Sequence, residues 1–380
     1  MLSKLFEPIT DSSTNGLSQI VYNLTQELVD LGHDVTLYAP LHSSINARLI
    51  PLSDLTNSWE TPLGRVLPVA AAFSDWRHFD IIHDHTRFYS TLFAHLIPIP
   101  VVSTVHHPIE FDELHWQHPA KEYSAFFRSI WERLVKNVNT VFVSQFQRAG
   151  FNGKAEVIYN GIPLNMWSKP HFASGRYLAF LGAINETKGT HEAIKAAHLA
   201  NEPIIVAGTT DESGEYFQRK IKPFVDGDQV KYIGSLNFKQ KQIFLAEAKA
   251  VLMPIQWDDP LPTVALESLA SGTPVIAWNR SSMGEIIENG KSGFLVSSIE
   301  EMAARVRDLS RIDRKACRSR AELLFDSRQM ANRYENLYKT LLGVPSRQRP
   351  NAAPAERAQE YEQLKSTLWT RAFAAPRGQS

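Results

Sequence analysis

The 380-residue sequence has one cysteine, no long apolar run and no excess of charge of either sign. A single cysteine, Cys317, excludes a disulfide framework and a cysteine-rich metal site. No segment approaches the roughly 20 apolar residues that cross a bilayer, and residues 1–8 contain no signal-peptide core. Lys and Arg number 40, as do Asp and Glu, so the basic footprint of a nucleic-acid-binding protein is missing. We expect a cytoplasmic globular protein without a nucleic-acid partner.

What the sequence does contain is a regular alternation of short apolar runs and amphipathic segments. Residues 17–31 place leucines, isoleucine and valine at helical spacing, and Gly32 follows as a helix cap. A short strand is expected at 35–38. Further strands are expected at 79–83, 101–105, 140–143, 177–181, 204–207, 230–233, 251–254, 274–277 and 294–296, and helices at 91–96, 121–137, 188–200, 238–248 and 262–270. This alternation is typical of βαβ units, and the length favours two domains. The predicted fold class is α/β, with two doubly wound, Rossmann-like domains facing each other across a cleft.

The irregular stretch 160–175 divides the two series of strands, and we place the boundary near residue 168. The domains are then 1–168 and 169–326. Residues 344–380 are predicted to form a linker rich in Pro, Ala and Arg and a tail with one more helix at 358–373. In parallel sheets ligands bind outside the carboxyl ends of the strands, which places the site between the domains.

One segment, Asp259 to Glu267, follows a predicted strand and opens a helix. Pro262 suits the first helical turn, where its missing N–H costs nothing. The amides of Thr263 and Val264 would then face the cleft at a positive helix end, a good place for a diphosphate. Glu267, one turn further on, could accept hydrogen bonds from ribose hydroxyls. On spacing alone, an ordinary capped helix whose Glu267 side chain faces solvent is as good an interpretation as a diphosphate and ribose site.

Residues 259–277 read D-P-L-P-T-V-A-L-E-S-L-A-S-G-T-P-V-I-A. They resemble the E-P-F-G-x-x-x-x-E-A-M-A-x-G-x-P-V-I-A hallmark of the retaining glycosyltransferases of family 4, which have the two-domain GT-B fold. Other segments resemble family motifs in the same order, with F-D-I-I-H-D-H at 79–85, N-G-I at 160–162, L-G-A…K-G at 181–189 and E-x-x-x-x-G-x-x-G-F-L-V at 285–296. The resemblance spans residues 15–342. Within the family, the sequence most resembles the antibiotic-tailoring (avilamycin-type) subgroup.

The resemblance implies that a nucleoside-diphosphate sugar binds between the domains and is transferred to a glycan, lipid-linked or small-molecule acceptor. It implies no metal and no other cofactor. His106 and Asp259 would contact the donor sugar, and Lys188 would neutralise its phosphates. The remaining binding residues implied by the family pattern are Gly16, Gly182, Pro262, Thr263, Val264 and Glu267. A helix at 327–343 would cross back to the first domain.

The sequence departs from the family pattern at several positions. Ala183 stands where the family has arginine, Asp259 replaces the first glutamate, and residues 1–7 are short for the first central strand. These departures motivate an alternative function, a catalytically degenerate GT-B protein that binds a nucleotide sugar or glycan without transfer.

Two further patterns invite a metal hypothesis. His83, Asp84 and His85 alternate on a strand, which favours a pocket-lining or structural role over a metal site. Asp226 and Asp228 imitate a D-x-D motif, but their place before a strand favours a turn.

A last alternative concerns location. Residues 123–138 carry a stripe of aromatic and basic residues. Such a stripe more often packs in a protein core, but peripheral contact with the inner membrane face is the alternative.

Overall fold

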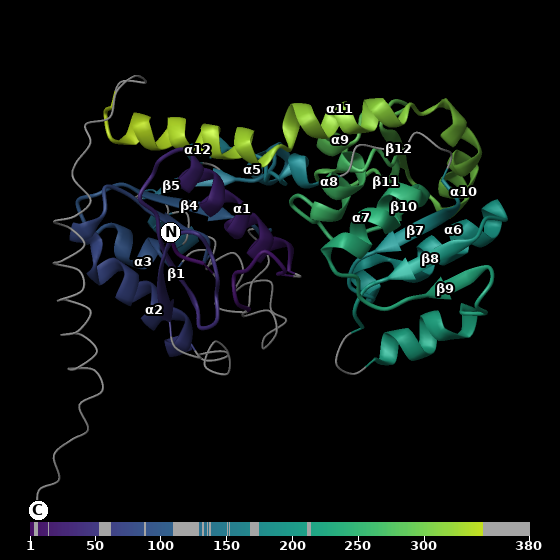
Figure 1. Cartoon of the computed structure of the whole chain (residues 1–380), viewed down its shortest axis with the longest axis horizontal. Coiled ribbons are helices and arrows are strands. Elements are labelled where there is room, and N and C mark those ends of the chain that lie inside the picture. Colours follow the sequence, from purple (N-terminus) through teal and green to yellow (C-terminus); the bar gives the residue numbers. More distant parts are fainter. Residues whose placement is uncertain are drawn as a thin grey trace, which may run out of the picture.

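The structure is a computed structural model that describes residues 1–3, 7–13, 15–52, 62–86, 89–108, 129–130, 133–134, 136, 138–149, 151, 153–167, 175–210 and 214–344. The expected helix at 121–137 lies mostly outside the described residues, and the tail lies outside them from 345 onward. Two α/β halves lie next to each other (Figure 1), and each is built on a parallel sheet. The predicted fold class is confirmed.

The first half contains a sheet in the order β3-β4-β5-β6, with β1 and β2 as a parallel pair beside it. Its strands are β1 (Thr36–Pro40), β2 (Arg48–Leu52), β3 (Ile82–Asp84), β4 (Val101–Val105), β5 (Asn139–Phe142) and β6 (Ala155–Val157). Its helices are α1 (Gly16–Asp30), α2 (Pro62–Ser74), the 3-10 turn Trp76–His78, α3 (Thr91–Ala94) and α5 (Gln145–Ala149). The carboxyl ends of these strands point toward the second half.

The first central strand is replaced by a very short segment around Leu2. This residue forms parallel bridges to both Tyr38 of β1 and Asp84 of β3. Its amide donates to the His83 carbonyl at 2.9 Å, and its carbonyl accepts from the amide of His85 at 3.0 Å. Leu2 is 1% exposed. The segment that is short in sequence therefore still fills the gap between β1 and β3. Leu2 bonds the β3 side, and Tyr38 of β1 donates to the Met1 carbonyl and accepts from the Ser3 amide.

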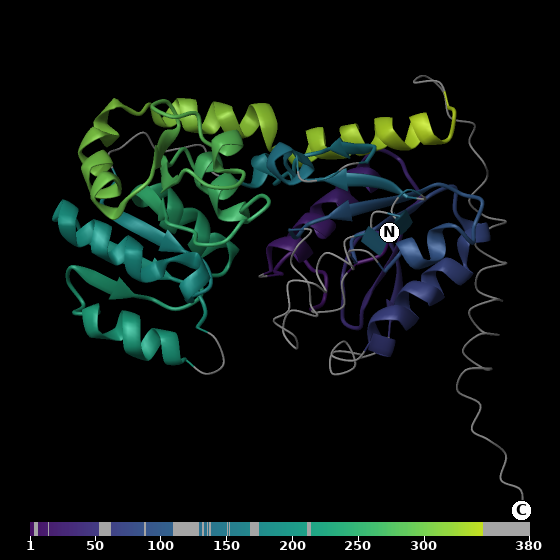
Figure 2. The ribbon, with the colours of Figure 1, turned by 180° about the vertical axis from the view of Figure 1, so that it is seen from behind.

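The second half has six parallel strands in the order β12-β11-β10-β7-β8-β9. They are β7 (Tyr177–Leu181), β8 (Ile204–Ala207), β9 (Val230–Tyr232), β10 (Ala248–Met253), β11 (Val275–Trp278) and β12 (Gly293–Val296). The helices around them are α6 (Thr190–Ala200), α7 (Phe238–Glu247), α8 (Thr263–Ala270), α9 (Met283–Ile286), α10 (Ile299–Arg307) and α11 (Arg314–Leu324). Central strand residues such as Leu178, Val251 and Ile276 are completely buried, as expected for strands covered on both faces. Figure 2 shows the same halves from behind.

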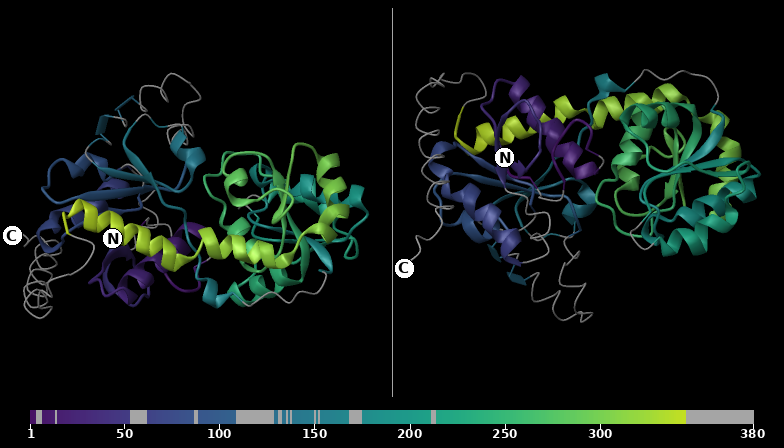
Figure 3. Two further views of the ribbon diagram at one scale, coloured as in Figure 1. Left: turned by 90° about the horizontal axis from the view of Figure 1, so that it is seen from above. Right: turned by 60° about the horizontal axis from the view of Figure 1, so that its bottom comes forward.

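The chain passes between the halves twice, and the two passages are hydrogen-bonded to each other. The Ile162 amide donates to the Phe325 carbonyl at 2.8 Å, and the Ser327 amide donates to the Ile162 carbonyl at 3.0 Å. Helix α12 (Ser327–Leu341) then lies along the first half against α1 (Figure 3). Ser327 Oγ donates to the carboxylate of Glu27 on α1 at 2.6 Å.

Most predicted elements are present, with shifted ends. The strand predicted at 79–83 begins at Ile82, because residues 76–78 form a 3-10 turn. The helix predicted from Lys188 begins at Thr190, since Lys188 ends a separate 3-10 turn and Gly189 follows with φ of +73°. The helix predicted from Pro262 begins at Thr263, and Pro262 is its N-cap.

We predict that Gly161→Ala destabilises the chain at the double passage. An added Cβ would lie 2.7 Å from the Asp326 carbonyl oxygen and 2.7 Å from Ser327 Cα, both backbone atoms that cannot give way easily. Overpacking of this kind costs about 1–3 kcal/mol, measurable as a lower free energy of unfolding in urea. Gly284→Ala is the control, because its Cβ would meet nothing within 4 Å. Equal effects of both variants would contradict the prediction.

Candidate functional site

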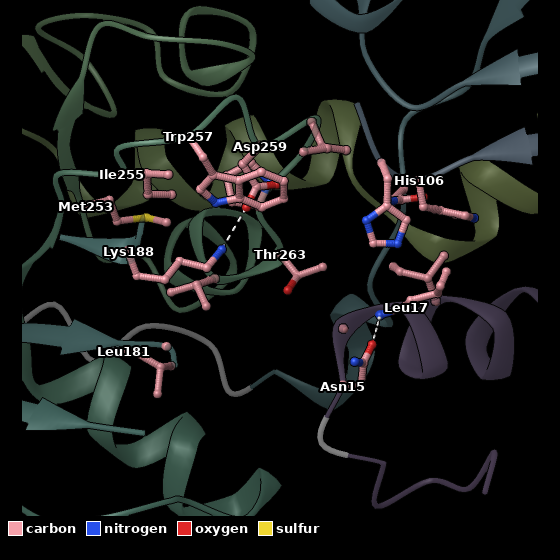
Figure 4. Close-up of a pocket in the computed structure, with 18 of the residues that line it drawn as sticks. Asn15, Leu17, His106, Leu181, Lys188, Met253, Ile255, Trp257, Asp259 and Thr263 are labelled. Atoms are coloured by element: carbon pink, nitrogen blue, oxygen red, sulfur yellow. Dashed lines mark hydrogen bonds and ion pairs between the residues drawn. The ribbon is translucent and has the colours of Figure 1, made fainter. Parts of the chain in front are cut away.

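A cleft between the two halves brings together nearly all of the predicted site residues (Figure 4). Eight of the nine line it, namely Gly16, His106, Gly182, Lys188, Asp259, Pro262, Thr263 and Val264. In Figure 4, Lys188, Trp257 and Asp259 lie on the wall formed by the second half, and His106 and Leu17 lie across from them. The site is therefore assembled from strand ends and helix starts of both sheets.

The ninth residue, Glu267, is not among those that line the cleft. It lies on α8 and is 2% exposed. Its carboxylate forms an ion pair with Lys241 of α7. A buried carboxylate needs such a partner, because isolated burial of charge is costly. Sequence spacing placed Glu267 correctly one turn beyond Thr263 but could not reveal Lys241, which is distant in sequence.

The N-terminus of α8 faces the cleft with Pro262 as its N-cap. Proline has no side-chain acceptor, so it cannot cap the first helical amides. The Ala265 amide bonds the Pro262 carbonyl at 3.1 Å. The loop before the helix is held by Ser282, whose hydroxyl donates to the Asp259 carbonyl at 3.2 Å. The cleft thus has a positive helix end on one wall.

Lys188 and Asp259 form an ion pair with Nζ and Oδ2 2.8 Å apart. Lys188 Nζ also lies 5.1 Å from the centroid of the Trp257 ring, within cation–π range. No sequence motif pointed to Trp257, although it stands two residues before Asp259 in the same strand-to-helix loop. The lysine head is thereby fixed by two partners, and its ammonium has three hydrogens to share with an anion as well as Asp259.

The first half approaches the same helix end very closely at Gly16. A Cβ added there would lie 2.9 Å from Thr263 Oγ1 and 3.2 Å from its Cγ2. Gly16 is also the first residue of α1, whose N-cap Asn15 accepts from the Leu17 amide at 2.9 Å. Glycine suits this position because an added Cβ would crowd the Thr263 side chain of the opposite half.

The family model for "Glycosyltransferase Family 4" matches residues 14–165, and that for "Glycosyl transferases group 1" matches residues 162–323. Together they account for both halves and the passage between them. This chain is a group 1 glycosyltransferase.

Individual relatives of the glycosyltransferase are distant. A glycogen synthase of Mycobacterium tuberculosis is 24% identical over 86% of this chain and 90% of that protein. AviGT4, a glycosyltransferase involved in avilamycin A biosynthesis, superposes with a TM-score of 0.64 at 22% identity, covering 90% of this chain and 98% of that one. Anabaena Alr3699/HepE, solved in complex with UDP and glucose, gives 0.68 at 16% identity, covering 89% of this chain and all of that one. These similarities support the GT-B fold.

Three histidines of the glycosyltransferase lie together, with His106 lining the cleft and His83 and His85 buried behind it. His85 Nδ1 is 2.9 Å from His106 Nε2. His83 bonds Thr104 Oγ1 at 2.7 Å and the Tyr338 hydroxyl of α12 at 2.6 Å. Across the described parts of the chain, no group of three or more His, Cys, Asp or Glu could hold a metal. The role that sequence favoured for His83 and His85, structural or pocket-lining, is the one their contacts support.

Two other sequence patterns are settled by their contacts. Asp226 Oδ1 accepts from the amides of Asp228 at 2.9 Å and Val230 at 3.0 Å, so D-x-D is a turn as expected. Cys317 is fully buried, and burial raises the pKa of its thiol to about 12. The neighbouring arginines therefore do not activate it. None of the helices in the described ranges is both long and apolar enough to cross a membrane.

Burial also makes the stability of the glycosyltransferase pH-dependent. It lowers the pKa of His85 from 6.5 to about 3, with a smaller contribution from the N-terminal ammonium. Between these two pH values the unfolded chain takes up a proton that folded His85 does not, so stability falls as pH falls below about 6.5. The loss is about 1.4 kcal/mol per pH unit from this group alone.

We predict that His85→Asn flattens this pH dependence. The variant lacks the titrating imidazole, so its free energy of unfolding should decrease less steeply than that of wild type between pH 6 and pH 5, by about 1.4 kcal/mol per unit. Urea denaturation at several pH values measures both slopes. Parallel pH profiles for the two proteins would show that His85 is protonated in the folded state or not buried.

Proposed function

We propose that this glycosyltransferase moves a sugar from a nucleoside-diphosphate sugar to an acceptor hydroxyl, with retention at the anomeric carbon and without a metal ion. The observation that carries the proposal is the wall formed by the α8 N-terminus and Lys188, which faces His106 and Gly16 across the cleft. Two amides at a positive helix end and a lysine offer the donors that a diphosphate needs. The HepE structure with UDP and glucose, which shares the fold, supports this choice of donor class.

The diphosphate would lie at the α8 N-terminus. The amides of Thr263 and Val264 would donate to phosphate oxygens, and Pro262 leaves that helix end open to a ligand. Gly182, at the end of β7 with φ of +152°, carries no side chain that would crowd the phosphates. Lys188 would share its ammonium between Asp259 and the diphosphate, and this contact strengthens as the leaving group gains charge.

The donor sugar would lie between Asp259 and His106. During transfer the bond from C1 to the β-phosphate oxygen breaks, and its electron pair goes to the diphosphate. The acceptor oxygen bonds C1 on the same face, and the acceptor proton passes to the departing phosphate oxygen. This course needs orientation and charge stabilisation from the protein rather than a covalent nucleophile.

The ribose is assigned to Glu267, which is buried one turn beyond the cleft-lining Thr263 on α8. Its ion pair with Lys241 fixes the carboxylate, which can still accept from hydroxyls through its remaining lone pairs. The acceptor is assigned to the first half, as a glycan, lipid-linked or small molecule. Segment 123–138, for which core packing was the favoured interpretation and membrane contact the alternative, lies mostly outside the described residues.

The proposal is tested by calorimetric titration with UDP, GDP, ADP and TDP, each with and without Mg²⁺. Selective binding of one diphosphate without metal is the expected result and defines the donor class. Its sugars are then offered with candidate acceptors, and NMR of the product reports the anomeric configuration. An inverted product would refute retention, and failure of every diphosphate to bind would refute the donor class. Binding without any transfer would favour the degenerate, non-catalytic alternative suggested by Ala183.

Lys188→Met should weaken binding of the selected diphosphate by about 10- to 100-fold, because one charge-assisted contact is lost and Asp259 is left without its cation. Methionine keeps most of the apolar stem that packs on Trp257. Lys195→Met, at an exposed position on α6, is the matched control and should bind as wild type does. An unchanged dissociation constant for Lys188→Met would show that the phosphates bind elsewhere.

A further inference from the structure

His85 lies directly behind His106 and does not line the cleft itself. It follows β3 and is 1% exposed, whereas His106 follows the neighbouring strand β4 and reaches the cleft. The strands are in parallel register, with Asp84 opposite Ser103. This register places the two rings 5.2 Å apart between centroids, with Nδ1 of His85 at 2.9 Å from Nε2 of His106.

The ring of His85 is held firmly in this position. Its backbone amide is bonded to Leu2, and its other face lies against His83, with ring centroids 4.1 Å apart. His83 in turn is fixed by Thr104 and by Tyr338 of α12. His85 therefore has little freedom to turn, and its contact with His106 is a fixed element of the site.

The surroundings of His85 indicate which of its ring nitrogens carries the proton and donates the hydrogen bond to His106. Its Nε2 is buried, and within the described part of the chain it has no hydrogen-bond partner. A buried N–H without an acceptor is rare and costly, so the single proton of neutral His85 belongs on Nδ1. Because burial lowers the pKa of His85 to about 3, the ring is neutral at ordinary pH. Nδ1–H then donates to His106 Nε2, and neutral His106 must carry its own proton on Nδ1.

We propose that His85 is a positioning residue for His106, fixing its ring and its Nδ1–H tautomer for hydrogen bonding to the donor sugar. The proposal rests on the proposed function, because it takes His106 as the residue that meets the sugar. It predicts that His85 affects sugar transfer and leaves binding of the free nucleoside diphosphate unchanged, since the diphosphate lies at the α8 N-terminus on the other wall.

Two variants of similar polarity distinguish a role of His85 in positioning His106 from a role in stabilising the fold. His85→Asn places an amide NH₂ where Nδ1 stood, so it can still donate to His106. His85→Gln carries its amide one bond further out, near the Nε2 position, and cannot. We expect His85→Asn to retain most of the transfer rate and His85→Gln to lose about tenfold in kcat/KM for the nucleotide sugar, with the dissociation constant of the diphosphate unchanged in both.

Tyr338→Phe is the control for disturbance of the buried cluster. It removes one hydrogen bond from His83 without touching the His85–His106 pair, so it should lower stability and reduce transfer much less than His85→Gln does. Equal activity of the Asn and Gln variants, or an equal loss in Tyr338→Phe, would overturn the proposal. If wild type itself neither binds a diphosphate nor transfers sugar, the proposed function fails instead.

A measurement that needs no activity tests the pair directly. In ¹⁵N-histidine-labelled wild type, the NMR shifts of His106, assigned with His106→Asn, should show a protonated Nδ1 and an unprotonated Nε2. The His85→Gln spectrum should show a mixture of the two tautomers. A wild-type His106 protonated on Nε2 would overturn the proposal even if the variants fail to fold.

Discussion

The whole arrangement depends on one constraint, the hydrogen-bonded crossing of two chain segments between the halves. Ile162 accepts from Ser327 and donates to the Phe325 carbonyl, so the outgoing and returning segments form a small ladder instead of two independent linkers. Gly161 lets them approach to backbone contact. Because both passages lie on one side, the two sheets remain facing each other with their strand ends toward a common cleft.

Helix α12 extends this constraint into the site. It leaves the crossing and packs on α1, and Tyr338 reaches the buried histidines under the cleft. At the other side of the crossing, Glu285 of α9 accepts from the amides of Gln145 and Phe146 at the start of α5 and from the Tyr159 hydroxyl. The two halves are thus connected by backbone hydrogen bonds, by a helix and by a carboxylate.

Local patterns in the sequence predicted the parts of the fold that depend on local properties. The bounds predicted for β4, β7 and β8 agree with the structure, because each is a short apolar run between turn residues. Strand β2 was missed since it is only partly buried and contains Pro51, which weakens both signals used to find a strand. Strand β6 was missed because its three residues, Ala155, Glu156 and Val157, are at most partly buried and form no apolar run.

Sequence patterns could not predict contacts between residues that are far apart in the sequence. The family motif and helix spacing brought Lys188, Asp259 and His106 into one predicted site, and the cleft contains all three. Neither signal could show that Glu267 is paired with Lys241, or that His85 bonds His106, since those contacts depend on strand register and helix packing. The short first strand was also undecidable from residues 1–7 alone, because its pairing is supplied by β1 and β3.

The contact of Gly16 with Thr263 has a consequence for long-range attraction. It brings the first turns of α1 and α8 together, and each helix start is equivalent to about half a positive charge. The protein as a whole has zero net charge, yet the peptide dipoles at this spot contribute a positive potential. Such dipoles do not titrate, so their contribution persists at every pH at which the fold survives. It acts over roughly 8 Å at physiological ionic strength, which confines the attraction of anions to the mouth of the cleft.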